Sequence, residues 1–362
     1  MTPLGFLMRE MKDNKKILVL PGDGIGPEVC KEATTVLKLV NEMHSLNLSF
    51  SEALVGGSAY EVTGEPLPQD TLKAAHESDA ILLGAVGGPK WDELDYQYRP
   101  ERALLGLRSE LDLFANFRPA ILSKYLTSSS SLKANKVENL DLLIIRELTG
   151  GIYFGEKGRR DGGETAFDNC VYTRAEVQRI AIKGFELAMT RGKKLCCVDK
   201  ANVLETSRLW RETVQAMEKD YPEVEVSYEF VDAVAMRLVQ WPNSYDVLIT
   251  ENLFGDILTD EASVISGSMG LMPSASVGTE NALFEPIHGS YPQATDLNIA
   301  NPMATILSAA MLFEHFGLQA EGKAIRDVVN SALEKGMVTE DLADGGKAYG
   351  TKEVGDWLAE NI

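Results

Sequence analysis

The sequence predicts an α/β protein of two domains. Strand-like apolar runs alternate with segments whose apolar residues recur every three or four positions, over nearly all of the 362 residues. This alternation is typical of strands connected by helices. Hydrophobic residues make up 44% of the chain and charged residues 25%, so a substantial core is expected. The length corresponds to about two domains of ordinary size.

The predicted elements can be placed in order along the chain. The strand candidates are 16–21, 79–86, 140–147, 193–200, 224–233 and 244–252. The amphipathic segments 174–192 and 204–221 lie between strands and are predicted to be helices. The polar segment 127–136 is expected to be a surface loop, not a domain linker. Segment 269–302 is punctuated by Gly and Pro and has little periodicity, so we expect a long irregular connection with a functional role.

Charge and cysteine content exclude several classes of partner. The net charge is −19, which repels nucleic-acid phosphates and anionic membranes, so neither partner is expected. The first 16 residues do not resemble a signal peptide, and no apolar run is long enough to span a membrane. Neither a zinc site nor a disulfide framework matches the spacing of Cys30, Cys170, Cys196 and Cys197. Cys196 and Cys197 are expected to fill the core, and a cytoplasmic protein is expected.

Several predicted strands end in a charged or polar residue. These residues are Arg146, Lys200, Asp232 and the pair Glu251–Asn252. Ligands of open α/β sheets bind at the carboxyl ends of the strands, so these ends can form an active site with charges of both signs. The alternative is that each strand simply ends where solvent begins, but four ends of mixed charge are harder to explain in that way.

Two aspartates in a helical pattern are candidate metal ligands. Asp256 and Asp260 are four residues apart, which places both carboxylates on one face of a helix. Hard cations such as Mg²⁺ or Mn²⁺ bind carboxylate oxygens and would offset the repulsion between the two charges. A solvated helix face is the alternative. Asp232, at the end of a predicted strand, would supply a third carboxylate and favours the metal site.

Arginine, tyrosine and lysine side chains complete the candidate chemistry. Arg108, Arg118 and Arg146 carry planar forks that suit a di- or tricarboxylate, although a surface salt bridge is the alternative for each. Tyr153 follows two glycines and is either a proton donor or an aromatic cover. Lys200 is a candidate base, because neighbouring cations would lower its pKa.

The segment LVLPGDGIGPEV at 18–29 resembles the phosphate-binding turn of a dinucleotide-binding unit. That turn requires the spacing G-x-G-x-x-G. Here Gly22, Gly24 and Gly26 are spaced G-x-G-x-G, and Pro27 occupies the position of the last glycine. Proline is accepted in the first turn of a helix. A tight turn from strand to helix is therefore predicted, and a Rossmann phosphate loop is not.

Together these segments resemble the β-decarboxylating dehydrogenases, the family of isocitrate, isopropylmalate, tartrate/malate and homoisocitrate dehydrogenases. The resemblance runs through LPGDGIGPEV, LLGAVGGPKW, LRSELDLFANFRP, RELTGGIYFG, VDKANVLE, TENLFGDILTDEAS, EPIHGS and IANPMATILSAAM. It implies a three-layer α/β fold with a mixed sheet and two domains, distinct from a Rossmann fold. A discontinuous domain, 1–113 with 267–362, would bind the cofactor. The other, 114–266, would hold the dimer contacts and the substrate and metal sites.

The resemblance also implies roles for the candidate residues. The malate carboxylates would be bound by Arg108, Arg118 and Arg146. Mg²⁺ or Mn²⁺ would be bound by Asp232, Asp256 and Asp260, and Asp232 would also lie near the substrate. Lys200 would take the hydroxyl proton as hydride passes to NAD, and Tyr153 would supply a proton after loss of CO₂. Lys200, Asn202 and Asp232 would belong to the second subunit of a homodimer, so that the active sites are shared.

Within the family the resemblance is greatest to the isopropylmalate branch of leucine biosynthesis. That branch typically has a Glu and two leucines before the first substrate arginine, and this chain has Glu101, Leu104 and Leu105. The leucines would form an apolar wall for an isopropyl group, whereas isocitrate requires polar partners for its extra carboxylate. An apolar wall discriminates weakly, so related alkylmalates are expected to be poor substrates.

The cofactor would lie along 278–302. The implied contacts are Ile25, Glu285, His288, Gly289, Ser290, Gln293 and Asn301. Many isopropylmalate enzymes have Asp-Ile where this chain has Gln293–Ala294. Gln hydrogen-bonds hydroxyl groups but lacks the positive charge that a 2′-phosphate favours, so NAD is expected. Asp296 and Asn298 replace residues of a glycine-rich turn, which leaves the local geometry open.

The implied reaction is the NAD- and metal-dependent oxidative decarboxylation of 3-isopropylmalate to 4-methyl-2-oxopentanoate and CO₂. One alternative is a sister enzyme acting on D-malate, tartrate or homoisocitrate. The other is a non-catalytic nucleotide-binding protein with this fold. The presence of Lys200, Tyr153 and the three aspartates argues against that second alternative.

Overall fold

The computed structural model describes residues 14–127, 130–265 and 267–362. Most of the N-terminal stretch that lacks the features of a signal peptide lies outside these residues. The described chain forms two compact units. The central unit contains residues 114–122 and 131–265, and the terminal unit contains residues 14–113, 123–127, 130 and 267–362. No helix within the described ranges combines the length and apolar character needed to cross a bilayer.

The central unit is built on five neighbouring strands in the order β4-β5-β10-β8-β9. Pairings along β5, β10, β8 and β9 are parallel, and β4 is antiparallel to β5. Residues 142–145 of β5 and 247–249 of β10 are almost completely buried, as expected for parallel strands covered on both faces. The bounds are β4 Ala115–Ile121, β5 Asp141–Glu147, β8 Lys194–Asp199, β9 Glu225–Phe230 and β10 Val247–Thr250.

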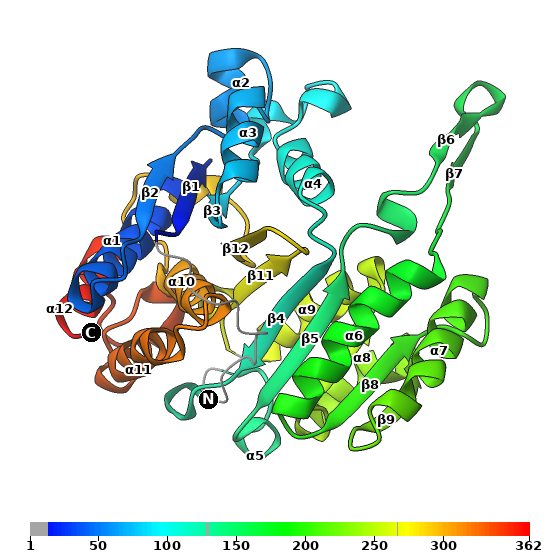
Figure 1. The fold of residues 1–362 in the computed structure, drawn as a ribbon. Coiled ribbons are helices and arrows are strands. Elements are labelled where there is room, and N and C mark those ends of the chain that lie inside the picture. The colour runs from blue at the N-terminus through cyan, green and yellow to red at the C-terminus, as the bar shows by residue number, and fades with distance from the viewer. Residues whose placement is uncertain (1–13, 128–129, 266) are drawn as a thin grey trace. The chain divides into compact units, whose positions relative to one another are not determined.

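Helices lie on both faces of these strands, with α6 and α7 in front and α8 and α9 behind in the view of Figure 1. The start of α6 is fixed by a capping box, in which Thr173 and Glu176 each bind the backbone N–H of the other. The separate ribbon of β6 and β7 is antiparallel. The bounds are α5 Ala134–Val137, β6 Lys157–Arg160, β7 Thr165–Asp168, α6 Arg174–Thr190, α7 Glu205–Met217, α8 Val231–Gln240 and α9 Asn252–Ile265.

The terminal unit contains five strands in the order β2-β1-β3-β12-β11. The pairings are parallel except that β11 is antiparallel to β12. The bounds of the strands are β1 Lys16–Gly22, β2 Ser49–Glu52, β3 Ala80–Ala85, β11 Pro273–Val277 and β12 Ala282–Pro286. Those of the helices are α1 Gly26–His44, α2 Gly57–Thr63, α3 Gln69–Glu77, α4 Glu101–Glu110, α10 Met303–His315, α11 Gln319–Lys335 and α12 Thr351–Glu360.

Helix α10 forms part of the core of this unit. Its residues 303–314 are all buried, because the sequence MATILSAAMLFE is apolar or small on nearly every face. It contacts β11, β12 and α11. A second core cluster joins Leu18 and Leu20 of β1 to Leu107 of α4 and Leu283 of β12. The strands and helices of this unit are thus held mainly by apolar burial.

The predicted α/β fold with mixed strands is confirmed. Each strand candidate contains a strand, and α6 and α7 occupy the two predicted helices. Cys196 and Cys197 are buried in β8, as predicted, and all four cysteines are free thiols. Pro27 lies in the first turn of α1, so the predicted turn from strand to helix is also confirmed.

Some expectations about elements are wrong. Segment 269–302 is not irregular throughout, since it contains β11 and β12, whose residues are all buried. These strands are five residues long and contain small residues and prolines, so they produce no recognisable period. The candidate 224–233 is too long, because α8 begins at Val231 within the same apolar run. Strand β4 was not predicted, because it contains Pro119 and proline is uncommon inside strands. Segment 127–136 includes the start of α5.

Candidate functional site

Charged residues gather at the carboxyl edge of the central strands. Because β5, β10 and β8 are parallel, the ends that carry Arg146, Glu251 and Lys200 lie at the same edge. Arg146 is the penultimate residue of β5, Glu251 follows β10, and Lys200 follows β8. The sequence predicted Asp232 at the end of a strand. In the structure Asp232 lies in the first turn of α8.

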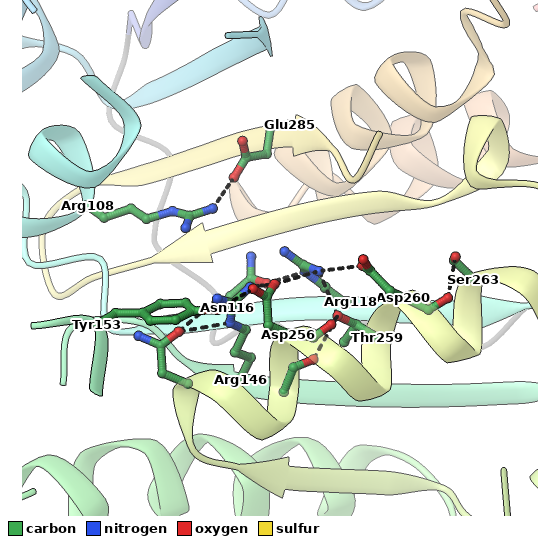
Figure 2. A network of polar contacts seen from close by, with 12 residues as sticks. Arg108, Asn116, Arg118, Arg146, Tyr153, Asp256, Thr259, Asp260, Ser263 and Glu285 are labelled. Carbon is green, nitrogen blue, oxygen red and sulfur yellow. Dashed lines mark hydrogen bonds and ion pairs between the residues drawn. The ribbon is translucent and has the colours of Figure 1, made fainter. Parts of the chain in front are cut away.

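Helix α9 presents carboxylates to arginines of β4 and β5 (Figure 2). Arg146 Nη1 forms an ion pair with Asp256 Oδ1, and Tyr153 Oη donates a 2.8 Å hydrogen bond to Asp256 Oδ2. Arg118 Nη1 lies 3.9 Å from Asp256 Oδ1 and 3.8 Å from Asp260 Oδ1. Asp256 and Asp260 share one face of α9, as their spacing predicts. The structure therefore brings five of the candidate residues into one network.

The two arginines are buried and the carboxylates face outward. The side chains of Arg118 and Arg146 are 9% and 3% exposed, whereas those of Asp256 and Asp260 are 37% and 68% exposed. Partial burial raises the pKa of the Asp260 carboxyl, and the Arg118 guanidinium opposes that shift. Gly255 leaves room for Arg146, because a Cβ at this position would lie 2.6 Å from Arg146 Cγ. The packing of α9 on β5 thus depends on the size of residue 255.

Three polar residues of this network were not singled out as arginine ligands from the sequence. Arg118 donates to Asn116 Oδ1 and to Thr259 Oγ1, at 2.7 and 2.6 Å. Arg146 donates twice to Asn252 Oδ1, from Nε at 3.1 Å and from Nη2 at 2.8 Å. The position of Asn252 at a strand end was the available signal. Asn116 gave none, because β4 was not predicted.

Lys200 and Asp232 form a separate pair. Lys200 Nζ contacts Asp232 Oδ1, and this contact holds the pKa of the Asp232 carboxyl below its usual range. Asn202 lies exposed in the turn after β8. Within the described part of one chain, no three His, Cys, Asp or Glu residues are grouped as metal ligands. The carboxylates of Asp256 and Asp260 still fit a divalent cation, because they supply hard oxygen donors on one exposed helix face.

In the terminal unit, α4 carries Arg108 and the residues expected to select the substrate. Arg108 Nη2 donates to Glu285 Oε1 of β12 at 3.1 Å, and both side chains are buried (Figure 2). Leu104 and Leu105 are half-buried, and Leu104 packs against the core cluster. Glu101 is exposed in the first turn of α4, with its carboxylate beside Gly87. These residues lie on one short helix, as their spacing requires.

The first loop of this unit is held by backbone contacts. Gly22 and Gly24 have φ of +75° and +59°, and a Cβ at Gly24 would lie 2.0 Å from Ser290 O. The next residue, Ile25, donates its N–H to Ser290 O at 2.8 Å. Asp23 was missed from the sequence, yet its buried carboxylate accepts three backbone N–H groups at 2.7–2.9 Å, those of Gly57, Ser58 and Gly87. The glycines therefore permit close backbone approach.

The segment expected to bind the cofactor lies beside this loop. Ile25 packs with Ala294 and Ala300 in a small apolar cluster. Asn301 Nδ2 donates to Asp341 Oδ2 at 3.1 Å. Asp296 and Asn298 adopt φ of +59° and +55°, so they supply the left-handed turn that glycine would otherwise provide. Ser290 is buried, whereas Gly289 and Gln293 are exposed.

His288 offers a donor or acceptor to a ligand. Its Nε2 is buried and has no hydrogen-bond partner among the residues that the structure describes, whereas Nδ1 lies 3.0 Å from Gly289 O. Burial lowers the pKa of His288, which favours the neutral form of the ring. A buried polar atom without a partner is costly unless a ligand or water satisfies it. This segment therefore fits a polar cofactor such as a nucleotide.

Several known proteins are similar to this chain. The sequence profile of the family described as isocitrate/isopropylmalate dehydrogenase matches residues 16–358. A 3-isopropylmalate dehydrogenase of Pseudomonas putida is 52% identical over 350 residues, which cover 95% of this chain and 97% of the relative. One of Hahella chejuensis is 51% identical over 357 residues, covering 95% and 98%.

Solved structures of dehydrogenases are also similar to this chain. The isocitrate dehydrogenase of Methylococcus capsulatus superposes with a TM-score of 0.86 at 34% identity, covering 96% of this chain and 99% of the other. A β-decarboxylating dehydrogenase of Thermococcus kodakarensis superposes with a TM-score of 0.79 at 36% identity, covering 96% of both chains.

Proposed function

The chain belongs to the isocitrate/isopropylmalate dehydrogenase family, and on this basis we propose that it catalyses the NAD-dependent oxidative decarboxylation of 3-isopropylmalate in leucine biosynthesis. Similarity to 3-isopropylmalate dehydrogenases over 95% of the chain carries this proposal. The product is 4-methyl-2-oxopentanoate, with release of CO₂. We place the enzyme in the cytoplasm.

The substrate's two carboxylates are bound by arginine in this proposal. Arg118 and Arg146 of the central unit, together with Arg108 of the terminal unit, are the binding residues. The burial of Arg118 and Arg146 supports the assignment, because a buried guanidinium binds a carboxylate more strongly than one in water. Each guanidinium is also fixed in orientation by neighbouring oxygens, which reduces the entropy lost on binding.

The proton transfers are assigned to Lys200 and Tyr153. When bound, NAD would accept the hydride from the substrate carbon, and Mg²⁺ or Mn²⁺, held by Asp256 and Asp260 with Asp232 of the partner subunit, would stabilise negative charge on the substrate oxygens. Lys200 Nζ takes the proton of the substrate hydroxyl as the ketone forms. After the β-carboxyl leaves as CO₂, Tyr153 Oη supplies a proton to the carbon that carried it.

We further propose a homodimer in which Lys200, Asn202 and Asp232 of one subunit complete the partner's active site. Helices α8 and α9 pack against each other and leave four apolar side chains 46–57% exposed: Met236, Val239, Ile257 and Val264. Exposed apolar side chains that cluster on adjacent helices indicate an interface. The pair of half-buried Lys200 and exposed Asp232 is then available to a second subunit.

Substrate preference is assigned to residues of α4, and cofactor preference to Gln293. Leu104 and Leu105 provide apolar surface for the isopropyl group, and Glu101 lies at the start of the same helix. Ile25, Glu285, His288, Gly289, Ser290, Gln293 and Asn301 are proposed to line the NAD site of the terminal unit. The exposed Gln293 is uncharged, which favours a ribose hydroxyl over a 2′-phosphate. The central unit is assigned to substrate, metal and dimer contacts.

A substrate panel tests the reaction. Purified protein with Mg²⁺ and NAD is expected to reduce NAD rapidly with 3-isopropylmalate and slowly with D-malate, tartrate and homoisocitrate. Brisk turnover of one of the latter without turnover of 3-isopropylmalate would assign a sister activity. Binding of NAD without turnover of any of the four would favour a non-catalytic nucleotide-binding protein. Replacing NAD by NADP is expected to reduce the rate.

A further inference from the structure

Asp23 of the first loop, residues 22–26, connects three segments of the terminal unit. Its Oδ2 accepts the N–H of Gly57 at 2.8 Å and that of Gly87 at 2.9 Å, and its Oδ1 accepts the N–H of Ser58 at 2.7 Å. Gly57 and Ser58 begin α2, whereas Gly87 follows β3. Asp23 is only 4% exposed. One buried carboxylate therefore fixes the start of α2 and the segment after β3 against the first loop.

The contact requires both oxygens of a carboxylate. Each Oδ atom of Asp23 accepts at least one N–H group, so the NH₂ group of an Asn at this position would face a donor. An apolar side chain would leave the buried N–H groups of Gly57 and Gly87 without this acceptor, which is costly. Gly56 leaves room for the carboxylate, because a Cβ there would lie 2.5 Å from Asp23 Oδ2. The size and the acceptors of Asp both fit the position.

The segments that Asp23 fixes converge on Ser290. Ile25, two residues after Asp23, donates its N–H to Ser290 O at 2.8 Å. A Cβ at Gly24 would lie 2.0 Å from the same oxygen, so the first loop and Ser290 approach closely. Gly87 is also near, since a Cβ at this position would lie 4.0 Å from Ser290 Oγ. Movement of the first loop or of Gly87 would therefore change the surroundings of Ser290.

We propose that Asp23 is a positioning residue for the cofactor, whose carboxylate holds the first loop and Gly87 beside Ser290 and so arranges Ile25 and Ser290 for NAD before it binds. This role rests on the proposed function, because Ile25 and Ser290 belong to the proposed NAD site. A site that is arranged in advance loses less entropy when the ligand binds. Loss of the contact is therefore expected to weaken cofactor binding more than it changes kcat.

A role in stability alone predicts a different result. Because Asp23 is buried and accepts three backbone N–H groups, its replacement is expected to lower thermal stability in either case. Only the positioning role also predicts weaker binding of the cofactor. The test therefore measures cofactor binding and stability on the same variants.

Two variants break the contact from opposite sides. Asp23→Asn removes one acceptor, and Ser58→Pro removes one donor while Asp23 stays in place. Proline is accepted in the first turn of a helix, and Ser58 is the second residue of α2. Ser58→Ala is the matched control, because it keeps the N–H and removes only the hydroxyl, which donates to Val55 O. Leu358→Ala, at a fully buried residue of α12, controls for lost stability.

Isothermal titration calorimetry measures the Kd of NADH, and hydrogen–deuterium exchange of the protein without NADH measures opening of residues 288–291. Asp23→Asn is expected to raise this Kd about tenfold or more, and Ser58→Pro about threefold or more. Both variants should show faster exchange at residues 288–291. Ser58→Ala and Leu358→Ala are expected to bind NADH within about twofold of wild type, although Leu358→Ala lowers Tm.

An NADH Kd of Asp23→Asn within about twofold of wild type would overturn the proposal, whatever the stability of the variant. If Asp23→Asn does not fold, Ser58→Pro decides in the same way, and failure of both to fold would assign Asp23 to stability. Equal weakening in Leu358→Ala would also overturn the proposal. If wild-type protein binds NADH but does not oxidise 3-isopropylmalate, the proposed reaction fails, and the NADH affinities still decide the role of Asp23.

Discussion

The carboxyl edge of the central unit and the first loop of the terminal unit both follow parallel strands, but different groups hold them together. At the central edge, side chains contact side chains: Arg146 and Tyr153 meet Asp256, and Arg118 lies near Asp260. In the terminal loop, backbone contacts backbone, as Ile25 N–H binds Ser290 O. Even Asp23, a buried carboxylate, accepts backbone N–H groups there.

The glycine motif of the terminal loop and the charged motifs of the central edge therefore act in different ways. The glycines of residues 22–26 act through the space they leave, so changes there are expected to alter stability. In the proposed reaction the charged residues of the central edge transfer protons or bind anions, so changes there are expected to alter catalysis. Variants in the two regions can test whether these consequences are in fact separate.

The largest effect is expected from Tyr153→Phe in the central edge. The substitution removes the hydroxyl that donates to Asp256 and that we assign as the proton donor. We expect kcat with 3-isopropylmalate to fall by about 10²–10⁴-fold, with little change in the midpoint of thermal unfolding. Tyr96→Phe, at an exposed tyrosine of the terminal unit, serves as the control and should retain full activity. A large loss of stability with wild-type kcat would contradict the comparison.

A smaller effect, of the opposite kind, is expected from Gly24→Ala in the terminal loop. The new Cβ would lie 2.0 Å from Ser290 O on a residue with φ of +59°. Backbone has to move to relieve this clash, and we expect a loss of about 2–4 kcal/mol in the free energy of unfolding. Urea denaturation measures it. Gly289→Ala is the matched control for stability, since its Cβ would meet no atom of the described residues within 4 Å. Equal stability of the two variants would show that the loop tolerates a side chain.

The sequence predicted the elements whose pattern is long and local. Apolar runs marked β1, β3, β5, β8 and β10, and the four-residue spacing placed Asp256 and Asp260 on one face of a helix. Parallel pairing then brought the strand ends to one edge, which is why Arg146 and Lys200 were found without a structure. Such signals depend only on neighbours in the chain or on a general property of parallel sheets.

Contacts between distant residues were not predictable. In the sequence Asn252 and Asn116 are ordinary polar residues. The fold places Asn252 against Arg146, 106 positions earlier in the chain, and pairing of β4 places Asn116 beside Arg118 of the same strand. Asp23 lies inside a motif dominated by glycine, and its three partners are the first two residues of α2 and Gly87 after β3. Strands β11 and β12 are too short to show a period. Each of these features is decided by tertiary packing.

The smallest effect is expected at Glu251, which makes the stability of the central edge depend on pH. Glu251 is 5% exposed at the end of β10, and burial raises the pKa of its carboxyl to about 7, with a further contribution from the nearby Glu147. The folded state therefore retains a proton that the unfolded chain releases near its ordinary pKa of 4.5. Stability is lost as pH rises through this window.

Glu251→Gln removes the titration and keeps the shape of the side chain. Between pH 5 and pH 8 we expect the variant to gain about 1–3 kcal/mol of unfolding free energy relative to wild type, as measured by urea denaturation across that range. Glu110→Gln, at an exposed residue of α4 in the terminal unit, should follow the wild-type curve. Parallel curves for Glu251→Gln and wild type would show that Glu251 ionises equally in the folded and unfolded states, and would contradict this prediction.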